Sequence, residues 1–186
     1  MARLPYADPQ SAPVRETLDR YPVAILRMLA HAESVFIPWM DYSRALLGQM
    51  ELDPVLRELA ILQLARLRDV EYQWVHHAAI ARAVGASAEQ VAAIKEGRED
   101  DASLGEAARE VLRFTREVTL DGAASEQSVE ALAARLGPRE VVELQLVVGH
   151  WNAICTFVSS FGLEPDLPAM AGALQDTLAL REAPAA

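Results

Sequence analysis

The sequence has 186 residues, of which 52% are hydrophobic and 24% are charged, and it carries a formal net charge of −10 at pH 7. A chain of this length can form one domain and bury roughly 70% of its unfolded surface. The acidic charge, with no block of lysine or arginine, argues against binding to nucleic acid or to an anionic membrane. No uninterrupted apolar run approaches the roughly 20 residues of a membrane span, and no secretory signal opens the sequence, so we expect a cytoplasmic protein.

The first part of the chain predicts an arm followed by short and medium helices. Residues 1–13 are rich in proline, and we expect them to lie extended against a neighbouring surface or to stay mobile. Apolar spacing then predicts three helices, over residues 14–20, 22–31 and 34–47. His31 ends the second of these, where a lone histidine usually binds backbone carbonyls or is half-exposed. We assign residues 1–21 to an N-terminal arm and short helix.

The centre of the chain predicts two antiparallel helices between Asp53 and Gly85. Asp53 is a suitable N-cap and the following proline a suitable first helical residue, so a helix is expected to begin there. This helix is too apolar for a surface helix, and we expect only its polar residues to reach outward, namely Arg57, Gln63, Arg66 and Arg68. Glu58 breaks that apolar pattern. A second helix, carrying His76 and His77, is expected to end at Gly85 in a left-handed cap.

The remainder of the chain predicts further helices and no strands. Ser87 and Gln90 have the spacing of a capping box, which predicts a short helix to about residue 96. Further helices are expected over residues 103–120, over 125–136 and from Pro138 onward, the last being nearly all apolar. We therefore predict an all-α, single-domain fold, with a helical domain over 22–166 and a C-terminal tail over 167–186.

Two stretches resemble a known family. LRELAILQLARLRDVEYQWVHHAAIARAVGASAEQVAAI, residues 56–94, is similar to the central motif of the carboxymuconolactone decarboxylase and alkyl hydroperoxidase D superfamily. VVELQLVVGHWNAICTFVSSFGLEPD, residues 141–166, resembles the closing helix of its decarboxylase-like members. The similarity covers roughly residues 22–166. It implies an alkyl hydroperoxidase D-like helical bundle and a symmetric homo-oligomer, a trimer or a hexamer.

The resemblance also implies a site, from which one component is missing. In the peroxidase branch of the family, a glutamate precedes a Cys-x-x-Cys pair by twelve residues, and a histidine follows the second cysteine by four. That pattern places Glu58 at the glutamate, Val70 and Gln73 at the cysteines, and His77 at the histidine. Peroxide reduction in that branch needs the two thiols. The only cysteine, Cys155, lies far along the chain in an apolar helix and is interpreted as a small buried hydrophobe.

An acid–base site remains once the thiols are discounted. If the two central helices fold back on each other, Glu58 can reach His77, fix its tautomer and leave its other nitrogen to exchange a proton. By resemblance, His77 and Glu58 are the candidate catalytic residues, and the decarboxylase branch needs no metal or organic cofactor. The candidate pocket residues are Val70, Tyr72, Gln73 and Trp74. His76 points about 100° away from His77 around the helix, so we expect it to face solvent or a second subunit. No His-x-x-x-His or Cys-x-x-Cys spacing indicates a metal site.

Two classes of function fit these residues. One is a cofactor-independent enzyme, a lyase or isomerase-like catalyst acting on a small carboxylated or oxygenated metabolite. The other is a non-catalytic helical oligomer that has lost its redox centre. In that case Glu58 and His77 only satisfy each other's hydrogen bonds. The family label also carries alkyl hydroperoxide reduction. The run His150-Trp151-Asn152 is either an interface element or the far wall of the site, and we favour the interface.

Overall fold

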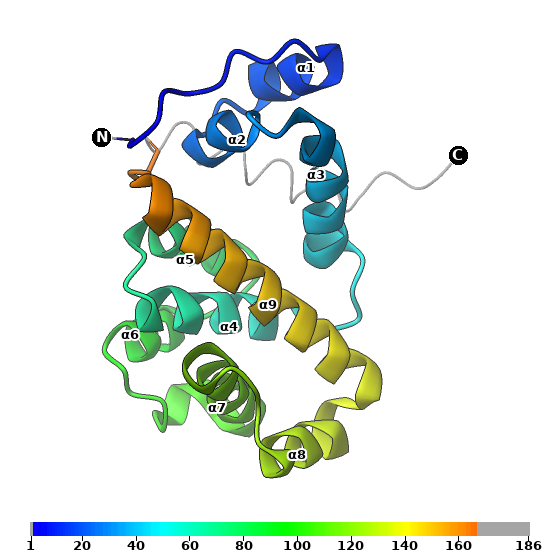
Figure 1. Ribbon diagram of the computed structural model, residues 1–186. Coiled ribbons are helices and arrows are strands. Elements are labelled where there is room, and N and C mark those ends of the chain that lie inside the picture. Colours follow the sequence, from blue (N-terminus) through cyan, green and yellow to red (C-terminus); the bar gives the residue numbers. More distant parts are fainter. Residues whose placement is uncertain (1, 167–186) are drawn as a thin grey trace. The chain divides into compact units, whose positions relative to one another are not determined.

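The computed structural model describes residues 2–166, and within that range all regular secondary structure is helical (Figure 1). This confirms the predicted all-α fold class. The residues form two compact units, one of residues 2–49 and 158–166 and the other of residues 50–157. The predicted tail over 167–186 lies outside the described residues, and the predicted domain boundaries stay a prediction.

The first unit contains three helices, α1 (Ala12–Arg20), α2 (Ala24–Leu29) and α3 (Glu33–Gly48). The N-terminal arm is held against this unit. The amide N–H of Arg3 donates to the carbonyl of Phe161 (2.8 Å), and the Arg27 guanidinium lies 3.9 Å from the centre of the Tyr6 ring. His31 Nε2 lies 2.8 Å from the carbonyl oxygen of Pro5, so its partner is in the N-terminal arm and not at the end of its own helix.

The second unit contains the remaining elements: α4 (Pro54–Leu67), α5 (Glu71–Ala83), α6 (Ala88–Lys95), a 3₁₀ turn η1 (Ala102–Leu104), α7 (Gly105–Asp121), α8 (Glu126–Leu136) and α9 (Pro138–Phe161), of which the last few residues belong to the first unit. The predicted capping box is present, with the Ser87 side chain accepting from the amide of Gln90 and the Gln90 side chain accepting from that of Ser87. Gly85 has φ +112°, which confirms the predicted glycine end of α5.

The core of the second unit surrounds α4, which packs against α5, α6 and α7 (Figure 1). The core side chains of these elements are Leu59, Leu62, Ala81, Ala86, Ala93, Ile94, Leu104, Ala108 and Leu112. Because α4 has neighbours on several sides, its residues 57–65 are all buried, polar ones included. This central position makes Glu58 a core residue.

The long helix α9 is apolar enough, by length and composition alone, to cross a membrane. Its mean hydropathy reaches 1.4 over the most apolar stretch. Half of that stretch is buried inside the structure, and the core helix of a soluble protein meets the same criterion. Packing within the chain therefore accounts for much of its apolar character.

Candidate active site

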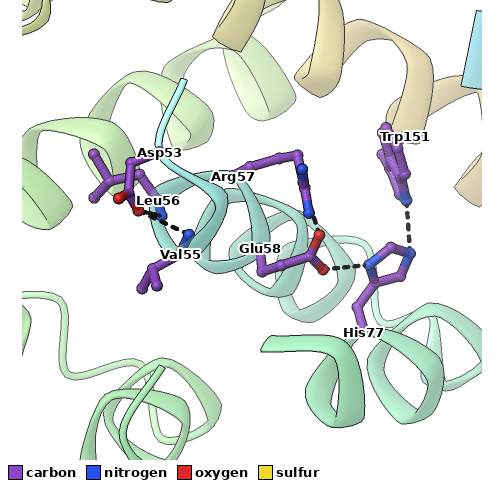
Figure 2. Close-up of polar contacts among 7 residues, drawn as sticks. All are labelled: Asp53, Val55, Leu56, Arg57, Glu58, His77 and Trp151. Atoms are coloured by element: carbon purple, nitrogen blue, oxygen red, sulfur yellow. Dashed lines mark hydrogen bonds and ion pairs between the residues drawn. The ribbon is translucent and has the colours of Figure 1, made fainter. Parts of the chain in front are cut away.

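The start of α4 fixes the position of Glu58. One carboxylate oxygen of Asp53 accepts hydrogen bonds from the amides of Val55 (2.8 Å) and Leu56 (3.1 Å), so the predicted N-cap is present (Figure 2). Pro54 occupies the first helical position, where its missing N–H costs nothing. Glu58 then follows in the second turn, and its side chain is fully buried.

The turn between α4 and α5 brings His77 to this carboxylate. Asp69 adopts a left-handed backbone conformation, with φ +52°, and α5 begins two residues later. His77 lies 19 residues after Glu58 in sequence, and its Nδ1 is 2.7 Å from Glu58 Oε2 (Figure 2). The imidazole is only 4% exposed. The two residues that the sequence placed in one relay thus form a direct, buried hydrogen bond.

Arg57 forms a polar cluster with Glu58 and His77, although the sequence predicted a different position for its side chain. We predicted that Arg57 faces outward, but it is buried, and its Nε donates to Glu58 Oε1 at 2.9 Å. A carboxylate in the core is stable only when a positive charge and hydrogen bonds replace the water it loses. Arg57 supplies that charge, and each oxygen of Glu58 therefore has its own partner.

Trp151 closes the other side of the imidazole. Its indole N–H donates to His77 Nε2 at 2.8 Å, and the two rings meet edge to face with their centres 5.4 Å apart (Figure 2). An indole N–H can only donate, so Nε2 must carry the lone pair. The proton of the neutral ring is then on Nδ1, where it donates to Glu58. The neighbours of His77 thereby define a single tautomer.

The electrostatics of the cluster favour an ionised Glu58. Burial alone would raise the pKa of its carboxyl group, but the attraction and hydrogen bonds of His77 and Arg57 outweigh it and lower the pKa below its ordinary 4.5. The cluster therefore holds a carboxylate and a guanidinium in the core, beside the imidazole of His77.

The predicted pocket residues lie at the start of α5, with mixed outcomes. Val70, Tyr72 and Gln73 are buried, whereas Trp74 is only partly buried. The Lys95 ammonium lies 5.8 Å from the centre of the Trp74 ring. The role of these four residues as pocket walls stays a prediction.

Two other sequence-based interpretations are wrong. His76 does not face solvent but is buried, with its ring centre 4.6 Å from that of Tyr72. Gln63 does not reach outward either, because its amide donates to Glu99 at 2.7 Å in a partly buried cluster with Arg66. In each case the residue lies on the side of its helix that a neighbouring element covers, which helical periodicity on α4 and α5 could not show.

The remaining reactive side chains are on α9. Burial raises the pKa of the Cys155 thiol to about 12, with only a partial opposing effect from Arg68, so the thiol is protonated at neutral pH. Burial also lowers the pKa of His150 to about 4. Within residues 2–166, no cluster of three or more histidine, cysteine or acidic side chains could hold a metal ion.

Arg57 and Trp151 are the site residues that sequence reasoning missed. Arg57 directly precedes Glu58, and a charge of opposite sign next to an acidic residue in an apolar helix is a signal that could have been used. Trp151 was noticed within the run His150-Trp151-Asn152 but was assigned to an interface. The structure instead supports the other interpretation for Trp151, as a wall of the candidate site.

Solved structures share this fold. An uncharacterized peroxidase-related protein from Ralstonia eutropha JMP134, described as an alkylhydroperoxidase AhpD core, superimposes with a TM-score of 0.77 at 18% identity, covering 91% of this chain and 94% of that one. A peroxidase-related protein from Silicibacter sp. TM1040 gives a TM-score of 0.76 at 18% identity, covering 91% and 93%. The debrominase Bmp8, solved with 2,3,4-tribromopyrrole, gives 0.71 at 16% identity, covering 95% and 96%. The fold is therefore AhpD-like.

A family model matches part of the chain by sequence. Residues 34–117 match the model of the carboxymuconolactone decarboxylase family, a range that includes both Glu58 and His77. No curated protein matches the chain by sequence at a significant level. The match and the shared fold support a relationship to the carboxymuconolactone decarboxylase and AhpD-like superfamily.

The buried charges predict strong coupling between Arg57 and Glu58. Replacing Glu58 with glutamine leaves the guanidinium without its carboxylate, and we expect it to reduce the free energy of unfolding by roughly 3–5 kcal/mol. Adding Arg57→Met to that variant should cost far less than Arg57→Met alone, with a coupling of about 2 kcal/mol or more. Urea unfolding of the four proteins measures this cycle.

The exposed pair Arg139–Glu51, 2.6 Å apart, is the matched control for that cycle, since its coupling should be much smaller. If the effects of Glu58→Gln and Arg57→Met were simply additive, the assignment of Arg57 as the compensating charge would be wrong.

Proposed function

We propose that the protein is a cofactor-independent acid–base enzyme acting on a small carboxylated or oxygenated metabolite. His77 is the proton shuttle, and Glu58 orients it. The observation that carries this proposal is the 2.7 Å hydrogen bond between Glu58 Oε2 and His77 Nδ1. A carboxylate on one nitrogen of an imidazole fixes the tautomer and orients the ring, which supports proton uptake and release at the other nitrogen.

The family supports a lyase reaction. A decarboxylase must deliver a proton to the carbon that loses CO₂, and a histidine held by a carboxylate can supply it. The carboxymuconolactone decarboxylase model covers both relay residues. We therefore take a carboxylated lactone as the first substrate to test.

Thiol-based peroxide reduction is less well supported than acid–base chemistry. The chain has one cysteine, Cys155, and burial holds its thiol in the protonated form. The nucleophile of such a reaction is the thiolate, and its recovery needs a second thiol. Val70 and Gln73, at the positions of the family's cysteine pair, supply neither.

A non-catalytic role is the second candidate, and one observation favours it. His77 is 4% exposed and Trp151 is 2% exposed, and both ring nitrogens of His77 are already hydrogen-bonded within the chain. A buried pair that satisfies its own hydrogen bonds can serve stability alone.

Mutation of adjacent histidines separates these two candidates. With carboxymuconolactone as substrate and CO₂ release as the measurement, we expect His77→Gln to lower kcat by a factor of about 100 or more. His76→Gln is the matched control, because His76 is the adjacent buried histidine and its ring packs against Tyr72. Its kcat, per folded molecule, should stay close to that of the wild type. Equal rates for His77→Gln and wild type, or no CO₂ release by wild type, would contradict the proposal.

We also propose that the protein forms a symmetric trimer or hexamer, as the resemblance implies. Val142 and Leu146, one turn apart on α9, are 59% and 44% exposed, which is unusual for large apolar side chains on the core helix of a monomer. Light scattering after size exclusion should give three or six times the chain mass of 20.3 kDa, and Leu146→Glu should reduce it. A wild-type protein that elutes as a monomer would disprove this assembly.

A further inference from the structure

Trp151 is hydrogen-bonded to the nitrogen through which His77 would act. Of the two imidazole nitrogens, Nδ1 is committed to Glu58, so only Nε2 can exchange a proton with another molecule. The indole N–H of Trp151 donates to that nitrogen at 2.8 Å. Both side chains are buried, and the indole N–H takes up the lone pair of Nε2.

Resting on the proposed function, we propose that substrates of this site displace the Trp151 indole from His77. Such substrates carry their own O–H or N–H group, which replaces the indole N–H as the donor to His77 Nε2. In this sense we call Trp151 a displaceable plug. Trp151 is then a positioning residue, since it acts through His77. It holds the unoccupied site in the tautomer that accepts a proton, with the lone pair pointing away from Glu58.

The hydrogen bond from Trp151 requires that His77 Nε2 carries no proton. Protonating Nε2 with the indole in place would set two N–H groups against each other at 2.8 Å, which is repulsive. A proton on Nε2 is therefore compatible with this geometry only after the indole has moved.

The step that follows displacement is a simple proton transfer. The proton of the substrate O–H or N–H moves to Nε2, and the bonding pair remains on the substrate oxygen or nitrogen. His77 becomes an imidazolium whose Nδ1–H still donates to Glu58. Nothing is oxidised or reduced, and the same proton can later be returned to a carbon or oxygen of the product.

This inference selects a substrate class by its hydrogen bonding. A molecule without a donor, such as an ester or ether of the same shape, would remove the indole N–H from Nε2 and offer nothing in its place. Leaving a buried acceptor without a donor is unfavourable. The site should therefore prefer enols, hydroxy acids and phenols over their methylated analogues.

The test uses the full chain with Trp151→Ala, which removes the plug and opens space for an indole. The probes are indole and indene, which have nearly the same shape, but only indole has an N–H. Histidine ¹⁵N NMR, with the His77 signals assigned by their loss in His77→Gln, reports binding at Nε2. We expect indole to bind about ten-fold more tightly than indene and to return the Nε2 signal to its wild-type position. Equal binding of the two probes, or binding of neither, would overturn the proposal.

A second measurement covers the case in which Trp151→Ala does not fold. Phenol and anisole are titrated into the wild-type protein, and the indole N–H signal of Trp151 is followed by NMR. Phenol should shift this signal and anisole should not, whereas no response to phenol, or an equal response to both, counts against the plug. Trp39→Phe is the matched control, since it removes a tryptophan of the first unit, on α3, and should leave the His77 signals unchanged.

The two proposals fail in different ways. The plug is judged by probe binding and NMR signals, which need no turnover. Failure of the acid–base function is judged by CO₂ release from His77→Gln and wild type. A protein that passes the probe test but releases no CO₂ would keep the plug and lose only the proposed reaction.

Discussion

The structure of the second unit depends on one ionised carboxylate in its core. Glu58 is fully buried on the helix that the other elements surround, where an unpaired charge would cost several kcal/mol. The chain meets this constraint with a partner for each oxygen, Arg57 on one side and His77 on the other. Trp151 then satisfies the remaining nitrogen of the imidazole. Three helices are thus joined by one chain of polar contacts.

The same polar contacts serve both the stability of the fold and the proposed chemistry. The interactions that hold Glu58 ionised also orient His77 and define which of its nitrogens carries the proton. The family's cysteine positions are occupied by Val70 and Gln73, yet the glutamate and histidine of the same motif remain in direct contact. The contact between Glu58 and His77 therefore does not depend on the thiols, which is why we propose acid–base chemistry for this chain.

The sequence predicted the local features of the fold better than the polar contacts of the site. The helix ends are set by residues close together in sequence, so sequence spacing was enough to predict the roles of Asp53, Ser87 and Gly85. The pairing of Glu58 with His77 was reached through the family motif. Arg57 and Trp151 could not be placed in the same way, because their partners depend on how α4, α5 and α9 pack. A charged residue on an apolar helix is normally expected to face water, and only the buried carboxylate beside it explains why Arg57 does not.

The ionisation of Glu58 is the most direct test of this account. In protein labelled with ¹³C at glutamate carboxyl groups, the signal lost in Glu58→Gln identifies this residue, and its chemical shift can be followed as the pH is lowered. Because His77 and Arg57 lower the pKa, the carboxylate should remain ionised through pH 4.5, the ordinary value, and take up a proton only below it, with folding stability falling as it does. A Glu58 that is already protonated above pH 4.5 would show that the core holds a neutral acid, and the relay described here would be wrong.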